Sequence, residues 1–388
     1  MMRRVYLDNN ATTPVLPEVL EAMRPYFGEH FGNASSIHHH GQETRAAVER
    51  ARESVAALLG CRASEVVFTS GGTEADNLAI FGLVREGDHV ITSTIEHHAV
   101  LNACKHLEEK GCEVTSIPVD GRGVVDPDDV KRALRPKTKL ITIMTANNET
   151  GIVQPVDEIG KIAAEADVYF HTDAVQAAGK IRIDVNKIGC DLLTISGHKI
   201  HAAQGIGALY VRKGTLLEAM LYGGSHERSR RAGTENVPGI VGLGTAAEIA
   251  RAAFERGDDK KMAAMRDQLE IALRHIEATG TNGEAAPRVP NTANIYFDYI
   301  EGEALVIALD LKGLAVSTGA ACSSGAIEPS HVLTAMGLRP DRARASIRFS
   351  LGKQNMPDDI DFALSLVPET VARLRELSPL YNKVAVTP

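Results

Sequence analysis

Strand-like and helix-like stretches alternate along residues 65–211, and this alternation restricts the fold more than any other feature of the sequence. Short apolar runs, many rich in β-branched residues, are separated by stretches in which apolar residues recur with helical spacing. The strand-like runs cover residues 66–69, 89–93, 113–119, 139–145, 168–172, 192–195 and 208–211. This order is typical of an α/β fold with a mostly parallel seven-stranded sheet covered by helices on both faces. Ligands bind to such sheets beyond the carboxyl ends of the strands.

The pattern changes after residue 236 and predicts a second, smaller α/β domain. Helices are expected from 236 to about 250, over 262–278 and over 302–311, and strands over 294–297 and 346–350. We expect three parts in a chain of 388 residues. They are an N-terminal segment of residues 1–15 that packs with the small domain, a large domain of residues 16–255, and a small C-terminal domain of residues 256–388.

Composition excludes several classes of protein. A formal net charge of −8 argues against a general nucleic-acid binder. No window approaches the roughly 18 apolar residues of a membrane span, and no apolar run follows the two N-terminal arginines, so neither a membrane segment nor a signal peptide is expected. The five cysteines are an odd number without a paired spacing, which favours a reducing compartment and predicts a cytoplasmic protein.

A lysine lies in an unusual place within residues 191–211. Lys199 follows one buried-strand pattern and precedes another, next to His198 and close to Ser196. Because lysine is seldom fully buried unless it is paired, one interpretation is a surface lysine on a connecting loop. The other is a Schiff-base lysine made nucleophilic by partial desolvation, with pyridoxal 5′-phosphate (PLP) as its carbonyl partner. That hypothesis predicts a carboxylate for the pyridine nitrogen, a phosphate cup and a ring-stacking group.

The sequence SGGT at 70–73 is the candidate phosphate cup. It joins a predicted strand to a predicted helix, so Gly72 and Thr73 would stand at a helix N-terminus with unpaired N–H groups. A Gly-Gly turn before a helix is also common without any ligand. The sequence GLGTAA at 242–247 resembles a dinucleotide-binding pattern, but it continues a helical pattern and does not follow a strand, so no dinucleotide site is expected there.

Polar residues follow three further predicted strands. Asp173 ends one of them and would hold a protonated pyridine nitrogen, or else cap the following turn. Gln176, three residues later, is placed to reach a ring oxygen. His97 follows another strand and would stack on the ring and handle protons, while the sequence NNETG at 147–151 supplies amides for a ring oxygen or a substrate carboxylate.

Taken together, these stretches resemble the fold-type I PLP enzymes of the class V aminotransferase group, and specifically cysteine desulfurases of the NifS/IscS type. The similarity spans nearly the whole chain. The matching stretches are YLDNNATTP at 6–14, FTSGGTEADNLAI at 68–80, EHHAV at 96–100, ANNETG at 146–151, HTDAVQAAGK at 171–180, SGHKI at 196–200, RRAGTENVPG at 230–239, STGAACSSG at 317–325, EPSHVL at 328–333 and SIRFSLG at 346–352.

The resemblance implies a role for each matching residue. Lys199 would carry the cofactor, Asp173 would pair with its pyridine nitrogen, Gln176 with its ring oxygen, and His97 would stack on the ring. The phosphate would be held by Gly72, Thr73, Ser196 and His198, with Thr234 reaching it from the second subunit of a homodimer. Asn148 and Arg348 would bind the substrate carboxylate, since an arginine can do so through two parallel hydrogen bonds.

Cys322 would be the nucleophile, and it is the only cysteine in a loop of small residues. The implied reaction converts L-cysteine to L-alanine and leaves a persulfide on Cys322, which then passes sulfur to an iron–sulfur cluster scaffold protein. No metal site is expected, apart from Cys322 as a candidate transient ligand of a cluster. The alternatives are a selenocysteine lyase or aminotransferase on the same fold, neither of which needs the thiol, and a weakly active platform that binds a scaffold protein.

One stretch departs from the family pattern. After SGHKI the family usually continues with an aromatic residue or histidine and then Gly-Pro, whereas this chain has His201-Ala202-Ala203. Because glycine supplies unusual backbone angles and proline a fixed one, the turn after Lys199 is expected to differ from that of relatives.

Overall fold

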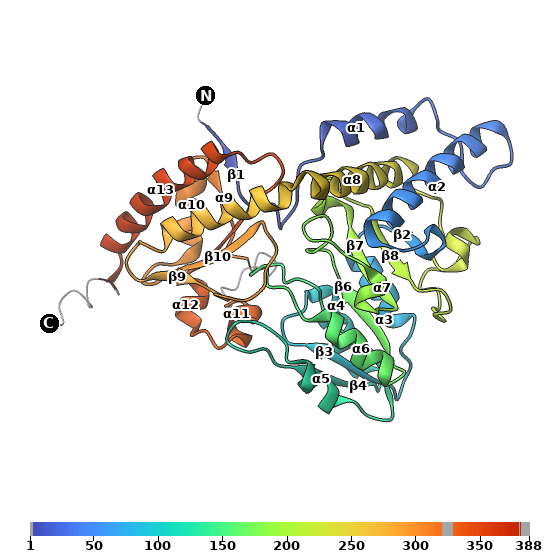
Figure 1. Ribbon diagram of the computed structural model, residues 1–388, viewed down its shortest axis with the longest axis horizontal. Helices are drawn as coiled ribbons and strands as arrows, with labels where there is room; N and C mark the ends of the chain where they lie inside the picture. The colour runs from blue at the N-terminus through green and yellow to red at the C-terminus, as the bar shows by residue number, and fades with distance from the viewer. Residues whose placement is uncertain (1–2, 320–328, 380, 382–388) are drawn as a thin grey trace.

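The computed structural model describes residues 3–319, 329–379 and 381, and its central element is a seven-stranded sheet (Figure 1). The strands lie in the order β2 (Val66–Thr69), β8 (Gly207–Val211), β7 (Leu192–Ser196), β6 (Tyr169–Asp173), β5 (Thr138–Thr142), β3 (His89–Ser93) and β4 (Glu113–Ile117). Only β8 runs antiparallel to its neighbours, and the remaining pairs are parallel. The predicted mostly parallel sheet of seven strands is confirmed.

Helices cover both faces of this sheet. In the first half of the chain they are α1 (Pro17–Met23), α2 (His39–Leu59), α3 (Gly72–Phe81), α4 (His98–Glu109), α5 (Pro127–Ala133), α6 (Val156–Glu165) and α7 (Val185–Ile188). Their ends follow local chemistry. Gly60 stops α2 with a φ of +73°, a left-handed conformation that glycine adopts without a Cβ clash. Pro127 opens α5, whose N-cap Asp126 accepts a hydrogen bond from the N–H of Asp128.

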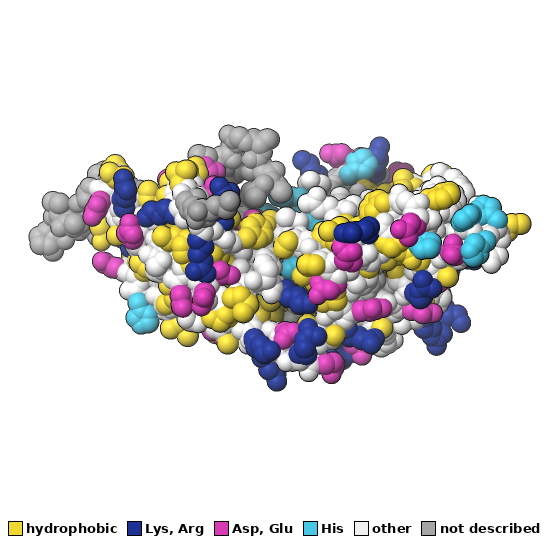
Figure 2. Space-filling model, turned by 90° about the horizontal axis from the view of Figure 1, so that it is seen from above, with side chains coloured by type: hydrophobic (Ala, Val, Ile, Leu, Met, Phe, Trp, Pro, Cys, Tyr) yellow, Lys and Arg dark blue, Asp and Glu magenta, His cyan; other side chains and the backbone are white. Residues whose placement is uncertain are grey.

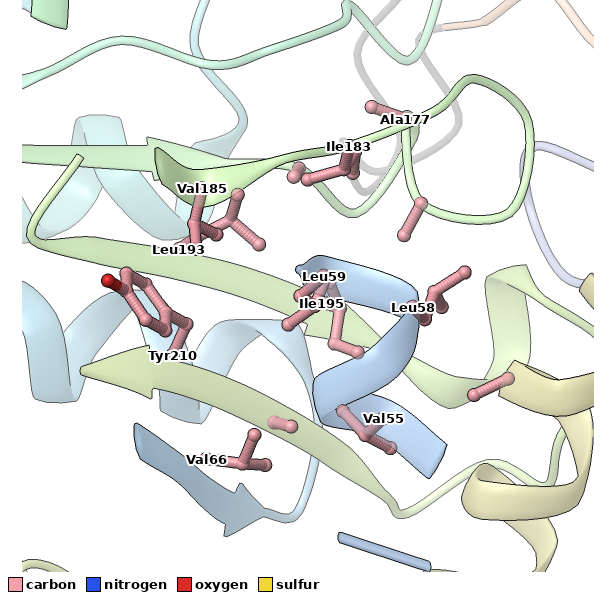
Figure 3. Close-up of a cluster of buried hydrophobic side chains, with 14 of the residues drawn as sticks. Val55, Leu58, Leu59, Val66, Ala177, Ile183, Val185, Leu193, Ile195 and Tyr210 are labelled. Atoms are coloured by element: carbon pink, nitrogen blue, oxygen red, sulfur yellow. The ribbon is translucent and has the colours of Figure 1, made fainter. Parts of the chain in front are cut away.

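The two faces of β7 show how the sheet is buried. Leu193 and Ile195 belong to the same cluster as residues of α2, with Ile195 beside Leu59 and Leu193 beside Val185 (Figure 3), whereas Leu192 packs into a separate cluster with α3 and α4. All five residues of β7 are buried. Each fully buried aliphatic side chain of this kind contributes roughly 1.5–3 kcal/mol to folding. Burial on both faces explains why these strands are continuous apolar runs without polar alternation.

The C-terminal part contains two small sheets and most of the remaining helices. Its antiparallel sheet consists of β9 (Thr279–Thr281), β10 (Thr292–Phe297) and β12 (Ser346–Ser350), and β1 (Val5–Tyr6) pairs in parallel with β11 (Leu314–Ala315). The helices are α8 (Val237–Arg256), α9 (Asp258–Leu273), α10 (Gly302–Leu311), α11 (His331–Ala335), α12 (Pro340–Arg344) and α13 (Pro357–Glu376). In Figure 1 β1 lies among α9, α10 and α13, and α8 continues into α9 from the large sheet to this part.

The bounds of one predicted helix differ from the structure here. The helix predicted over 262–278 is α9, which begins at Asp258 and ends at Leu273. Asp258 and Asp259 stand in its first turn, where acidic side chains stabilise the helix dipole. Only Gly257, with a φ of +70°, separates α8 from α9. The division of the chain into domains stays a prediction, with its boundary close to this junction.

None of the helices in the described part of the chain combines the length and the apolar character needed to cross a membrane.

Candidate active site

A cavity of about 350 Å³ lies beyond the carboxyl ends of the central strands. Ten of the twelve predicted site residues line it, namely Gly72, Thr73, His97, Asn148, Asp173, Gln176, Ser196, His198, Lys199 and Arg348. Thr234 is exposed and does not line the cavity. Cys322 lies outside the described residues. The structure thus brings together side chains from five separate connections, as expected for the carboxyl edge of a parallel sheet.

One end of the cavity is suited to an anion. The chain leaves β2 and enters α3 at Gly72, and the N–H groups of this first turn have no partner within the helix. A Cβ on Gly72 would lie 2.9 Å from Cγ2 of Val175, so only glycine lets the helix start approach this closely. Ser196 at the end of β7 and His198 line the same cavity. Burial, followed by the nearby charge of Lys199, lowers the pKa of His198 to about 4.

Two buried carboxyl groups, those of Asp173 and Asp76, also line the cavity. Asp173 ends β6 and its Oδ1 accepts a hydrogen bond of 2.8 Å from the N–H of Val175, so it also caps the following turn. Asp76 of α3 has an Oδ1 without a hydrogen-bond partner among the described residues, 3.6 Å from Nε2 of His171. Burial raises the pKa of both carboxyl groups. The carboxyl group of Asp173 lines the cavity and can accept a hydrogen bond from a protonated pyridine nitrogen, so the residues present fit PLP.

His97 is held as a neutral ring. It is the N-cap of α4, and its Nδ1 accepts a hydrogen bond of 3.1 Å from the N–H of Ala99. That bond leaves Nε2 as the protonated nitrogen of the neutral tautomer. Burial, with the charges of Lys199, His98 and His331, lowers the pKa of His97 to about 4. At neutral pH the ring is therefore an uncharged, flat group able to stack and to accept or donate a proton.

Lys199 lies in a short 3-10 helix, Gly197–Lys199, directly after β7. Its Nζ donates hydrogen bonds of 2.6 Å to the backbone carbonyl oxygens of Asn10 and Ala11. Both carbonyls belong to the N-terminal segment, which crosses the site. Lys199 is therefore held at the cavity wall by contacts that the sequence around it does not predict.

Arg348 of β12 and Asn148 form the side of the cavity nearest the C-terminal part. The guanidinium donates from Nη1 to the backbone oxygen of Asn148 at 2.9 Å and from Nη2 to Oδ1 of Asp8 at 2.7 Å. Its Nε has no hydrogen-bond partner among the described residues although it is buried. An arginine has five N–H donors, so donors remain for a carboxylate ligand. The neighbouring Asn147 instead stabilises the turn through the N–H groups of Glu149 and Thr150.

Backbone hydrogen bonds hold the turn after Lys199, which departs from the family pattern. Ala202 is fully buried, and its N–H donates a hydrogen bond of 3.0 Å to the carbonyl oxygen of Gly197. The left-handed conformation falls on His201, with a φ of +69°, and on Gly205, with a φ of +79°. His201 is fixed by a hydrogen bond of 2.8 Å from its N–H to Oγ1 of Thr13. The turn thus closes without glycine or proline at positions 202 and 203.

Two polar residues that line the cavity have no role in the sequence analysis. Asn10 lies within the quoted stretch YLDNNATTP but was assigned no role, and Asp76 lies within the quoted stretch that contains the phosphate cup. Asp76 is the one acidic residue among the buried positions of α3, where Ala75, Leu78 and Ala79 are its neighbours. An unpaired acid on a buried helix face was the signal available in the sequence.

Comparisons with known proteins give consistent results. The family model described as aminotransferase class-V matches residues 5–362. A relative named cysteine desulfurase IscS from Methanosarcina thermophila is 51% identical, covering 98% of this chain and 95% of the relative. A solved NifS-like protein is 38% identical with a TM-score of 0.88, covering 96% of this chain and 100% of the other. The structure described as SspA in complex with cysteine is 38% identical with a TM-score of 0.80, covering 89% of this chain and 98% of the other.

Proposed function

The chain belongs to the aminotransferase class-V family, and from this premise we propose that it is a PLP-dependent cysteine desulfurase. It converts L-cysteine to L-alanine and transfers the sulfur to Cys322 as a persulfide. The observation that carries the proposal is the cavity in which Lys199, Asp173 and His97 meet the N-terminus of α3. Relatives about half identical over nearly the full length support the same activity, because they are named cysteine desulfurase IscS.

The residues of the cavity divide into those that would hold PLP and those that would hold the substrate. The phosphate would lie against Gly72, Thr73, Ser196 and His198. The pyridine nitrogen would face Asp173, the ring oxygen Gln176, and the ring His97, with Lys199 carrying the aldehyde carbon. When bound, PLP supplies an electron sink for the bonds at the substrate α-carbon. The substrate carboxylate would bind Arg348 and Asn148.

The chain's own groups move the protons and the sulfur. The amine of Lys199 takes the proton from the α-carbon and returns one at the end of the reaction, and the neutral ring of His97 assists. The C–S bond of the substrate breaks with its electron pair left on carbon, and the sulfur joins the thiolate of Cys322. The carbon then takes up a proton and leaves as part of L-alanine. The persulfide sulfur passes to an acceptor, which we propose is an iron–sulfur cluster scaffold protein in the cytoplasm.

A homodimer is the second part of the proposal. Thr234 is exposed in the single chain, and it would reach the phosphate only in the site of a partner. Apolar side chains are exposed nearby at Leu216 and Tyr222, with 82% and 88% of their surface accessible. Exposed Phe31 and Ile37 belong to the connection between α1 and α2, where histidine and apolar side chains gather at the right-hand end of Figure 2. We propose that these side chains are buried in the dimer interface, since large exposed apolar surfaces mark such interfaces.

The decisive experiment measures alanine and sulfide released from L-cysteine in the presence of a thiol reductant, for the native chain and for Cys322→Ala. We expect equal amounts of both products from the native chain and neither from the variant. Release that the variant does not lose would mean a lyase reaction without the thiol. Pyruvate-dependent conversion of bound PLP to its amine form would indicate an aminotransferase. Absence of products, with PLP still bound and a scaffold protein still captured, would indicate a binding platform.

A further inference from the structure

A second lysine, Lys180, reaches the wall of the same site without an assigned role. It is partly buried, and its Nζ donates hydrogen bonds of 2.5 Å to Oε1 of Gln176 and 2.9 Å to Oδ1 of Asn10. Removal from water, followed by the charges of Lys199 and Arg348, lowers the pKa of Lys180 well below its ordinary value. Removing a charged amine from water costs free energy, and both residues that accept hydrogen bonds from Lys180 line the cavity.

The contact with Gln176 fixes the direction of a carboxamide. Nζ of Lys180 has the two N–H donors that its contacts need whether the amine is charged or neutral, and the atom of Gln176 that accepts from it is the oxygen. The Nε2 of Gln176 is then on the opposite side, where it donates a hydrogen bond of 3.0 Å to the carbonyl oxygen of Asn10. One N–H of Nε2 remains to face the cavity. Without Lys180, the amide would lose the contact that distinguishes its oxygen from its nitrogen.

The contact with Asn10 fixes the segment that holds Lys199. Oδ1 of Asn10 accepts from Lys180 and, at 3.0 Å, from Nδ2 of Asn291, while its Nδ2 donates 2.9 Å to Oγ1 of Thr292. The backbone oxygen of the same residue accepts from Lys199. Lys180 is therefore one of the groups that determine where the two carbonyls beside Lys199 lie.

We propose that Lys180 is a positioning residue of this site, which turns the amide N–H of Gln176 toward the ring oxygen of PLP and holds Asn10 against Lys199. The proposal rests on the proposed function, because it assigns the ring oxygen to Gln176. It attributes to Lys180 an action through Gln176 and not a direct part in proton transfer. A lysine that merely completes the packing would affect folding but not the environment of the cofactor.

The test compares Lys180→Met, which keeps the length of the stem and removes the donors, with Lys187→Met, an exposed control. The dissociation constant of PLP is measured by equilibrium dialysis, and the absorption spectrum of bound PLP is recorded against pH. We expect at least about a tenfold weaker affinity for Lys180→Met and a shifted pH midpoint of the spectrum, with the control unchanged. Native PLP affinity and an unchanged pH midpoint in Lys180→Met would overturn the proposal. The proposal would also be overturned if the only change in this variant were a lower Tm of the cofactor-free protein.

A double-mutant cycle separates action through Gln176 from a general effect. In a Gln176→Leu background, Lys180→Met is expected to change PLP affinity less than threefold, because the group it orients is gone. The full tenfold effect in that background would refute the mechanism. Should Lys180→Met not fold, Gln176→Glu keeps an acceptor for Lys180 but has no N–H for the cavity, and it is expected to weaken PLP binding equally. Unchanged PLP binding in Gln176→Glu would also refute the proposed role of Lys180. Failure of the proposed function reads differently, since it appears in the products that the native chain forms from L-cysteine, whereas the role of Lys180 is read from PLP affinity and the spectrum of bound PLP.

Discussion

At the scale of single residues, burial decides which protonation states the site adopts. Glu96 precedes His97 and is fully buried, with Oε1 bonded to the hydroxyl of Ser93 and the N–H of Met144. Its Oε2 has no partner among the described residues. Burial raises the pKa of Glu96 from 4.5 to about 8, and the charge of Asp173 acts in the same direction. A neutral acid therefore supports the loop that carries the stacking histidine.

This shift predicts how stability depends on pH. An unfolded chain loses the proton of Glu96 near pH 4.5, whereas the folded chain keeps it until about pH 8. The folded state binds more protons in that window, so the free energy of unfolding falls as pH rises through it. Burial lowers the pKa of His97 and of His198 to about 4. Their shifts make the free energy of unfolding rise with pH, but only below about pH 6.5. These two histidines therefore do not mask the effect of Glu96 between pH 6.5 and 8.

We expect Glu96→Gln to remove this dependence in the cofactor-free protein. Relative to the variant, the native chain should lose up to about 1.4 kcal/mol of unfolding free energy per pH unit between pH 6.5 and 8. Urea unfolding at three pH values measures the difference. Glu53→Gln, which changes an exposed acid on α2, serves as the control and should follow the native chain. Parallel curves for Glu96→Gln and the native chain would mean that Glu96 is already ionised in the folded state.

Lys199 gives the second prediction at this scale. Lys199→Ala should lower the rate of alanine formation from L-cysteine by at least about a thousandfold, because the variant lacks both the base and the amine that carries PLP. It should also lack the absorption of lysine-linked PLP. Lys187→Ala, at an exposed lysine paired with Asp157, is the matched control. Retention of a tenth of the native rate would show that another group acts as the base.

At the scale of elements, glycines in α8 set how closely the helices pack. The stretch GLGTAA at 242–247 lies within α8, which confirms its interpretation as a helix. A Cβ on Gly242 would lie 2.6 Å from Sδ of Met23 in α1, and a Cβ on Gly244 would lie 2.6 Å from Cα of Ala51 in α2. The glycines that mimic a nucleotide-binding pattern therefore serve the contact between helices.

Gly244→Ala is expected to destabilise the protein by about 1–3 kcal/mol. Alanine favours a helix interior over glycine by roughly 1 kcal/mol, but the new methyl meets backbone atoms of α2, which cannot rotate away as a side chain can. Thermal and urea unfolding give the measurement. In Gly28→Ala the new Cβ has no atom within 4 Å, and this control should leave stability nearly unchanged. A gain of stability in Gly244→Ala would mean that α8 can move away from α2 at little cost.

The bounds of a helix or strand could be predicted where a single local sequence pattern determines them. The strands β2, β3 and β12 and the helix α10 have the predicted bounds, because each is a short apolar run or periodic stretch between clear breakers. The helix α13 has no counterpart among the predictions, and Pro368 within it interrupts the local signal. Likewise the antiparallel direction of β8 depends on a turn of ten residues and not on the composition of the strand.

At the scale of the whole molecule, the site depends on contacts between distant segments. The residues around the cavity were predictable because each follows a strand, but the contact between Lys199 and Asn10 joins positions 189 residues apart. The N-terminal segment also bonds to the C-terminal part, where the N–H of Asn10 donates 2.9 Å to Oγ of Ser350. Local patterns carry no information on such pairings, which explains why Asn10 and Lys180 received no role from the sequence.

The proposed dimer gives the last prediction, since it completes the phosphate site. A Cβ on Gly223 would lie 3.1 Å from Cβ of Ala232, so exposed Tyr222 adjoins the segment that carries Thr234. Charges placed on an apolar interface disfavour its burial. Leu216→Asp combined with Tyr222→Asp should therefore give monomers by sedimentation equilibrium.

The same double variant should bind PLP at least about tenfold more weakly by equilibrium dialysis, because no partner supplies Thr234. Leu377→Asp changes a residue of similar exposure, 74%, just after α13 and should leave both the dimer and the affinity intact. A monomeric variant with native PLP affinity would show that one chain builds the whole phosphate site, and it would remove Thr234 from it. A variant that still dimerises would place the interface away from residues 216–222.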